Sequence, residues 1–327
     1  MNGKRNTPID ISKGIGIFLV VLGHVLKTML PNSSVLYALI YSFHMPLFFC
    51  ISGYLAYVTY SNKESTAILL QKTKTILLPF IIWGITYSIY SGNNISIFLF
   101  DKWNLGYWFL ISLYFIFILH LFAHRMHTIF TKYNKILEVI LYFIAFCIII
   151  LIETKYIKIN DSISRIMQIH YLSKYYPFFI LGWLVNEYNK YIERIINKDI
   201  IYALSLIIFI TCFLIQLLYK SSFITIFMCG VSGSILTLYI ANTQITNQQI
   251  KSFFIVLGKY SLNIYVIHYF LINFNLNEIF NITTSYNSVI ILSIALPITM
   301  FVICLCLFLN KILTYSSKVN KILFGGK

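Results

Sequence analysis

Charge is what this sequence has least of. Only 11% of its 327 residues are charged, and Asp and Glu together number ten, whereas about a quarter of the residues in an ordinary soluble domain are charged. Apolar runs of about 20 residues, the length of one membrane-spanning helix, recur along the chain with short polar segments between them. The scarcity of charge excludes a soluble globular protein and predicts an all-α polytopic integral membrane protein.

Cysteine is also scarce, and the six cysteines fall inside apolar runs without the spacing of metal ligands. We therefore expect neither a disulfide framework nor a metal site. The net charge of +15 is a feature of many nucleic-acid-binding proteins. Here, however, the cations are scattered through loops between apolar spans, which is typical of membrane topology, so no nucleic-acid partner is expected.

The apolar runs predict about ten transmembrane helices. They are expected at residues 10–30, 35–60, 75–92, 105–123, 136–153, 169–187, 200–219, 222–241, 256–275 and 286–312. Most Lys and Arg residues lie in segments on the side of the N-terminus, which predicts that both termini are cytoplasmic. Residues 95–104 are apolar but short and predict an interfacial or re-entrant piece.

The first apolar run lacks a small-residue cleavage site and is followed at once by another, so it is expected to be retained rather than removed as a signal peptide. Little chain is left for anything outside the membrane. We expect residues 1–327 to form a single transmembrane domain with no separate soluble domain. The expected location is multi-pass in the cell membrane, the plasma membrane of a bacterium.

Three histidines fall inside predicted helices, where ionisable residues are rare. His24, His44 and His268 lie about 9 to 14 residues from a helix end, which places all three near the middle of the bilayer. Groups at that depth usually face a bundle interior or a watery cavity, so the three predict a shared site. Each can also serve only as a hydrogen-bond partner for a neighbouring helix, and that interpretation stays open.

Lys13 lies on the first predicted helix, eleven residues before His24. Eleven helical steps of about 100° bring the two side chains within about 20° of the same face, about 16 Å apart along the axis. Asp10 is expected to pair with Lys13 or to cap the helix. Lys13 is either a snorkelling anchor or a ligand for a phosphorylated molecule.

Other polar and aromatic residues can each be interpreted in more than one way. Lys72 and Lys74 form a basic cluster before the third helix, which either sets topology and binds lipid headgroups or holds a phosphorylated ligand. Trp108 is expected to be an interfacial anchor or a platform for a sugar. The histidines at 120, 124 and 127 are interpreted as solvated residues at a helix end, and His170 as a cap or a substrate contact.

Four stretches of the chain, in order, resemble one known family. They are Asp10 and Lys13 followed by Val20-Val21-Leu22-Gly23-His24; His44-Met45-Pro46-Leu47-Phe48-Phe49 with Ile51-Ser52-Gly53-Tyr54; Tyr107-Trp108-Phe109-Leu110; and Leu257-Gly258-Lys259-Tyr260-Ser261 through Tyr265 to His268. Together they resemble the membrane acyltransferase-3 family, in the subgroup of fucose O-acetylases and surface-polysaccharide O-acyltransferases. The family's paired arginines before the third-helix proline are not reproduced, since Lys72 and Lys74 stand there at a different spacing.

The resemblance implies a membrane O-acyltransferase, most often an O-acetyltransferase, that uses cytoplasmic acyl-CoA such as acetyl-CoA. The acceptor would be a hydroxyl of a cell-surface or lipid-linked saccharide, and no metal is implied. We hypothesise that His24, His44 and Asp10 act in catalysis, with His24 as base or acyl relay. Donor binding is assigned to Lys13, Lys72 and Lys74, and acceptor binding to His268, Trp108, Ser52 and Tyr265.

Two other functions fit the polar residues. A transporter or polysaccharide flippase would use intramembrane histidines for proton coupling, although such proteins often contain internal repeats with matched broken helices, and the sequence has no evident repeat. A non-catalytic membrane subunit would not require Lys13 and His24 to share a face. In all three cases the surrounding partner is membrane lipid.

Overall fold

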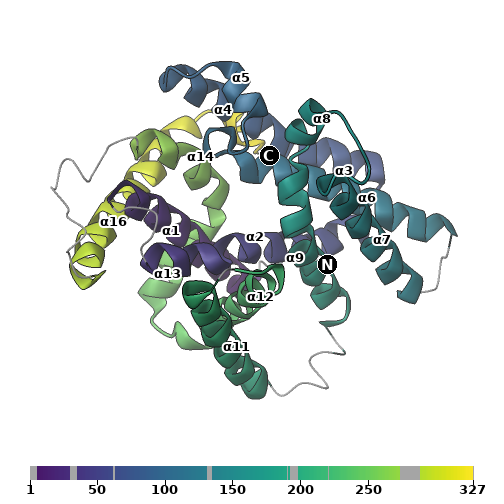
Figure 1. Ribbon diagram of the computed structural model, residues 1–327. Coiled ribbons are helices and arrows are strands. Elements are labelled where there is room, and N and C mark those ends of the chain that lie inside the picture. Colours follow the sequence, from purple (N-terminus) through teal and green to yellow (C-terminus); the bar gives the residue numbers. More distant parts are fainter. Residues whose placement is uncertain are drawn as a thin grey trace. The chain divides into compact units, whose positions relative to one another are not determined.

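The computed structural model describes residues 6–29, 35–61, 63–130, 135–189, 191, 198–219, 221–272 and 288–326. Within these residues the chain is helical and contains no strand, which confirms the all-α prediction (Figure 1). The elements are α1 (Thr7–Met29), α2 (Val35–Ser61), α3 (Ser65–Lys72), η1 (Thr73–Leu77), α4 (Leu78–Tyr90), α5 (Ile95–Phe100), η2 (Asn104–Gly106), α6 (Trp108–Phe130), α7 (Lys135–Glu153), α8 (Asp161–Ile166), α9 (Ile169–Glu187), α11 (Lys198–Leu218), α12 (Phe223–Tyr239), η3 (Ile240–Gln244), α13 (Gln248–Lys259), α14 (Ser261–Leu271), α16 (Ser288–Leu313) and α17 (Ser317–Phe324).

Eight helices of the described chain are long and apolar enough to cross a membrane, and a bent pair would make nine. The third of them, Ser65–Tyr90, starts ten residues before the predicted 75–92, because α3, the π-helical turn η1 and α4 run on as one helix. The predicted helix at 169–187 is present as α9. The polytopic membrane fold is therefore confirmed.

The prediction of one helix at 256–275 is wrong. The chain bends by 81° between α13 and α14, at Tyr260, whose φ of −104° and ψ of 18° are not helical. Polar residues at Ser261 and Asn263 open the second piece. A depth counted along a straight helix consequently does not apply to His268, and residues 273–275 lie outside the described part of the chain.

The chain forms two compact units. The first is Met1–Ile51 with Tyr188–Ile312, and the second is Ser52–Glu187 with Leu313–Lys327. In the first unit α1 packs along α13 and α14, and α11 packs on α12; in the second, α6 packs on α7 and α9, and α5 meets α8. The single domain over residues 1–327 stays a prediction.

Two glycines allow α1 and α13 to approach backbone to backbone. A Cβ atom on Gly14 would lie 2.0 Å from the carbonyl oxygen of Phe254, and one on Gly258 would lie 1.8 Å from that of Asp10. Real Cβ contacts are never this short, so both positions require glycine. This packing fixes the start of α1, which carries Asp10 and Lys13, against the helix that leads into α14.

Candidate active site

Two of the three predicted intramembrane histidines are in ring contact. The ring centres of His24 on α1 and His268 on α14 lie 5.1 Å apart. His24 is half-buried, whereas His268 is completely buried. The structure therefore brings together two imidazoles that are 244 positions apart in the sequence.

A tyrosine links the two histidines. The Tyr269 hydroxyl lies 3.1 Å from Nε2 of His24, and its ring centre lies 5.0 Å from that of His24 and 4.1 Å from that of His268. Tyr269 is not among the site residues predicted from the sequence. The sequence does contain an indication of it, because Tyr269 is a phenol directly after a histidine in an apolar segment.

The backbone sets the tautomers of two rings. Nδ1 of His44 lies 2.7 Å from the Ile40 carbonyl oxygen, and Nδ1 of His268 lies 3.1 Å from that of Ile264. A carbonyl oxygen only accepts hydrogen bonds, so each Nδ1 donates and each neutral ring keeps its lone pair on Nε2. Nε2 of His268 is buried and has no hydrogen-bond partner among the described residues, so the ring holds an unused hydrogen-bond acceptor.

His44 adjoins the pair through aromatic rings of its own helix. The Tyr41 ring lies 4.8 Å from His44 and 6.5 Å from His24, and Tyr37 stacks on Tyr41 at 3.9 Å. Tyr37, Tyr41 and His44 follow the i, i+4, i+7 spacing of one helix face. That spacing was the missed signal for both tyrosines.

Lys13 forms the expected ion pair at the start of α1. Its Nζ lies 2.7 Å from Oδ1 of Asp10, with 22% of the Lys13 side chain and 9% of the Asp10 side chain exposed. The pair holds a cation near the helix start in a partly buried setting, where charge interactions are stronger than in water. This geometry fits Lys13 both as a membrane anchor and as a residue that binds a phosphate group.

The predicted acceptor residues divide between the two units. Tyr265 is buried in the first unit, its ring 5.9 Å from that of His268. Ser52 and Trp108 belong to the second unit. Ser52 is half-buried, and Trp108 stacks on Tyr171 with ring centres 4.1 Å apart.

The predicted donor lysines of the second unit occupy different environments. Nζ of Lys72 lies 3.6 Å from the ring centre of Phe117 in a cation–π contact, whereas Lys74 is exposed. Lys72 and Lys74 are separated by two positions in the sequence, and side chains at that spacing do not share a helix face. The glycine at 325, with φ 62°, packs against the Lys74 carbonyl, so the residues after α17 lie beside the π-helical turn.

The interpretation of His120 and His124 as solvated residues is wrong. His120 is completely buried and stacks on Tyr142 at 4.3 Å, next to Trp183 at 4.5 Å. Nδ1 of His124 lies 3.1 Å from a carboxylate oxygen of Glu138. Packing of α7 and α9 on α6 covers a face that a depth count alone leaves exposed. The side chain of residue 127 lies outside the described residues. His170 is exposed and pairs with Glu153 at 2.7 Å.

Within the described residues, no group of three His, Cys, Asp or Glu side chains is arranged to hold a metal ion. The candidate site therefore consists of imidazoles, phenols and one ion pair. These groups can transfer protons and orient a hydroxyl.

Comparison with known proteins decides the family. The family model described as an acyltransferase domain matches residues 6–309. The chain belongs to the acyltransferase-3 family. The match includes α1, α2 and α14 and therefore the histidine cluster, which consists of His24, His44, His268 and Tyr269.

Two curated relatives are detected, both called nodulation protein NolL. The protein of Sinorhizobium fredii is 29% identical over 195 residues, 55% of this chain and 48% of that protein. The protein of Mesorhizobium japonicum is 36% identical over 85 residues, 24% of this chain and 23% of that protein. The chain thus spans at most about half the length of the curated relatives it matches. No solved structure matches it at a significant level.

Proposed function

We propose that this chain is a membrane O-acyltransferase that moves an acyl group, most often acetyl, from cytoplasmic acyl-CoA to a hydroxyl of a cell-surface or lipid-linked saccharide. The observation that carries the proposal is the contact between His24 and His268 in a chain of the acyltransferase-3 family. The Lys13–Asp10 pair on the same helix as His24 supports it. The proposed location is the plasma membrane.

The chemistry requires one base and one oriented acceptor. In our proposal His24 takes the proton of the acceptor hydroxyl while the hydroxyl oxygen attacks the thioester carbonyl. A carbon–oxygen bond forms, the carbon–sulfur bond breaks, and the leaving CoA thiolate receives the proton from the His24 imidazolium. His268 would accept a hydrogen bond from the acceptor, because its Nε2 has no other described partner. In the relay version, a His24 nitrogen attacks the thioester first, the carbon–sulfur bond breaks, and the CoA thiolate leaves with the ring N–H proton. The acceptor hydroxyl then takes the acyl group from the acyl-imidazole and returns its proton to the ring.

The donor would approach along α1. Lys13 lies about 16 Å from His24 along the helix axis, so it would bind CoA phosphates while the thioester reaches the imidazole. Phosphate would compete with Asp10 for the Lys13 ammonium. Lys72 and Lys74 would add further cations for the same anionic donor.

Radiolabelled acetyl-CoA tests the proposal on the purified protein in lipid nanodiscs. We expect label on a glycan acceptor, or on the protein if the relay operates, and loss of that label in His24→Ala at unchanged expression. Retained transfer in His24→Ala would remove His24 from the mechanism. Absence of both transfer and CoA binding in the natural protein would refute the enzyme.

The bent pair α13–α14 keeps a transporter as the second candidate, because broken helices frequently form transport sites. A transporter would move a glycan or a proton across vesicles without consuming acetyl-CoA. The radiolabel experiment distinguishes the two, since only an acyltransferase converts acetyl-CoA to free CoA in proportion to acceptor modified.

A further inference from the structure

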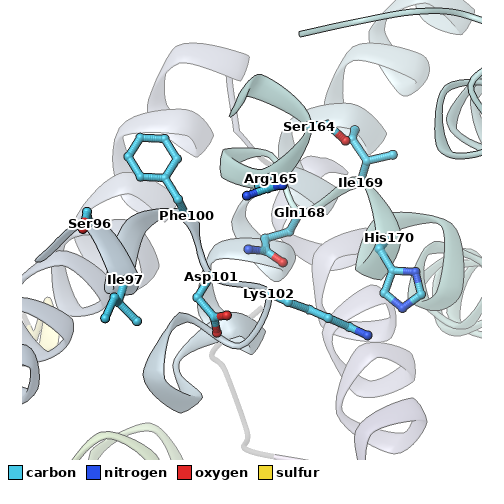
Figure 2. A pocket seen from close by; sticks show the side chains of 10 residues that line it. All are labelled: Ser96, Ile97, Phe100, Asp101, Lys102, Ser164, Arg165, Gln168, Ile169 and His170. Atoms are coloured by element: carbon cyan, nitrogen blue, oxygen red, sulfur yellow. The ribbon is translucent and has the colours of Figure 1, made fainter. Parts of the chain in front are cut away.

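A polar cavity of about 820 Å³ lies in the second unit, where α5, α8 and the start of α9 meet. Its polar lining consists of Ser96, Asp101, Lys102, Ser164, Arg165, Gln168 and His170. In Figure 2 the Lys102 side chain extends toward the His170 ring, with Gln168 and Arg165 above it. None of these side chains belongs to the histidine cluster. The predicted topology puts this end of the helices on the outer side of the membrane.

Two cations, Lys102 and Arg165, and one carboxylate, Asp101, line the cavity, and the Lys102 ammonium lies 5.4 Å from the Trp103 ring centre. No described ion pair involves Lys102 or Arg165, whereas His170 is paired with Glu153. The Asp101 carboxylate accepts a hydrogen bond from the backbone N–H of Trp103 at 2.8 Å. An anion in the cavity would meet the Lys102 ammonium and the Arg165 guanidinium, which binds phosphate or carboxylate with two parallel hydrogen bonds.

The wall of the cavity is built in advance. The Gln168 amide donates to Oδ1 of Asn104 at 2.8 Å, and the Asn104 amide donates to the Phe98 carbonyl at 2.7 Å. Both residues are buried and have positive φ, 54° and 44°, a conformation that costs free energy in residues other than glycine. A strained, hydrogen-bonded wall is already ordered before a ligand arrives, which lowers the cost of binding.

Aromatic rings continue from the cavity. The ring centre of Trp103, the residue after Lys102, lies 6.2 Å from that of Tyr171, and Tyr171 stacks on Trp108. The Tyr171 hydroxyl is buried and has no hydrogen-bond partner among the described residues. Flat aromatic faces with polar edges suit ligands that are apolar on one face and rich in hydroxyls at the rim, as sugars are.

We propose that this cavity binds an anionic saccharide, with Lys102 and Arg165 on its phosphate or carboxylate group and Gln168 and Ser164 on its hydroxyls. The inference rests on the proposed function and deepens it, because it gives the acceptor a negative charge. The bound saccharide would be oriented by the pocket on the side that is predicted to be outer.

Glucose 1-phosphate and uncharged methyl glucoside are suitable probes for the natural protein in phosphatidylcholine nanodiscs. We expect glucose 1-phosphate to bind at least tenfold more tightly, and Lys102→Gln and Arg165→Gln each to weaken its binding about tenfold. Arg165→Lys should retain part of the affinity. Lys158→Gln, an exposed lysine that does not line the cavity, is the matched control and should leave binding unchanged.

Three results would overturn the inference. They are equal affinity for the glucoside, equal affinity for inorganic phosphate, and unchanged glucose 1-phosphate binding in the Lys102→Gln, Arg165→Gln double variant. Displacement of glucose 1-phosphate by phosphatidylglycerol nanodiscs, lost in the double variant, would assign the cavity to a lipid headgroup and also overturn it.

His24→Ala separates this inference from the proposed function. It should abolish acyl transfer and leave glucose 1-phosphate binding unchanged. Binding without any transfer in the natural protein would refute the enzyme and support the cavity. Transfer without binding would refute the cavity alone.

Discussion

The molecule contains two histidine clusters that differ in their partners. In the first unit, His24 and His268 interact with each other, with Tyr269 and with a backbone carbonyl. In the second, His124 contacts the Glu138 carboxylate and His120 is enclosed by the rings of Tyr142 and Trp183. Phenols occur in both clusters, since the Tyr142 hydroxyl lies 3.1 Å from Nδ1 of His124 and the Tyr176 hydroxyl lies 3.4 Å from Nδ1 of His120. The Glu138 carboxylate is the partner that distinguishes His124 from His24 and His268, whose described contacts are rings, a hydroxyl and a carbonyl.

Burial separates His24 from His120, although His268 is as completely buried as His120. His24 is half-buried, so a substrate can reach it, whereas His120 is completely buried among large aromatic side chains. An intramembrane histidine is thus informative through its neighbours rather than through its depth. We expect the first cluster to carry chemistry and the second to stabilise the packing of α6 on α7 and α9.

The largest contrast is expected between His24→Ala and His120→Ala. Loss of a general base costs about 10²- to 10⁴-fold in rate, so His24→Ala should reduce acetyl transfer by that amount with little change in thermal unfolding. His120→Ala should lower the unfolding temperature and retain most of the transfer rate per folded molecule. The opposite pattern would assign the chemistry to the second cluster.

Trp183→Ala should produce the largest loss of stability. Trp183 is 1% exposed and its ring adjoins His120, His124 and Tyr60. Truncation of a buried tryptophan costs about 3–5 kcal/mol. Thermal unfolding in detergent measures it, with Trp103→Ala as control, because Trp103 is exposed and its loss should cost far less.

Gly258→Ala tests how the first cluster is positioned. The added methyl group would collide with the Asp10 carbonyl, and α13 would have to move away from α1 at a cost of about 1–3 kcal/mol. Since α13 leads directly into α14, transfer should fall together with stability. Ser252→Ala, at an exposed position of α13, should change neither, and an unaffected Gly258→Ala variant would argue against the tight α1–α13 contact.

Tyr269→Phe should have the smallest effect. It removes the hydroxyl 3.1 Å from His24 and keeps the ring, so it should cost about 0.5–1.5 kcal/mol, the net value of one hydrogen bond. The measurement is the transfer rate as a function of pH. A rate equal to that of the natural protein at every pH would remove Tyr269 from the site.

The helical membrane fold follows from sequence patterns, because apolar length is readable along the chain. The rarity of membrane histidines singles out His24 and His268, but the depth argument that placed His268 beside His24 assumed a straight helix that the chain does not form. The bend at Tyr260 is not readable in this way, because the contact beside it, Gly258 against the α1 backbone, is tertiary. An apolar run looks continuous in the sequence even where tertiary contacts break it.

The burial of His120 was missed for a related reason. Its neighbours Tyr142 and Trp183 come from α7 and α9, and no local pattern around residue 120 reveals them. The polar cavity also depends on tertiary structure, because Lys102 and Arg165 lie on separate segments that only the meeting of α5 with α8 brings together.

A double-mutant cycle on His24 and His268 tests the central claim most directly. The transfer rate is measured for His24→Ala, His268→Ala and the double variant, at equal amounts of folded protein. If the two imidazoles act as one unit, the double variant should be no more than about threefold slower than the slower single variant. Losses that multiply, or a single variant with the natural rate, would contradict a shared catalytic site.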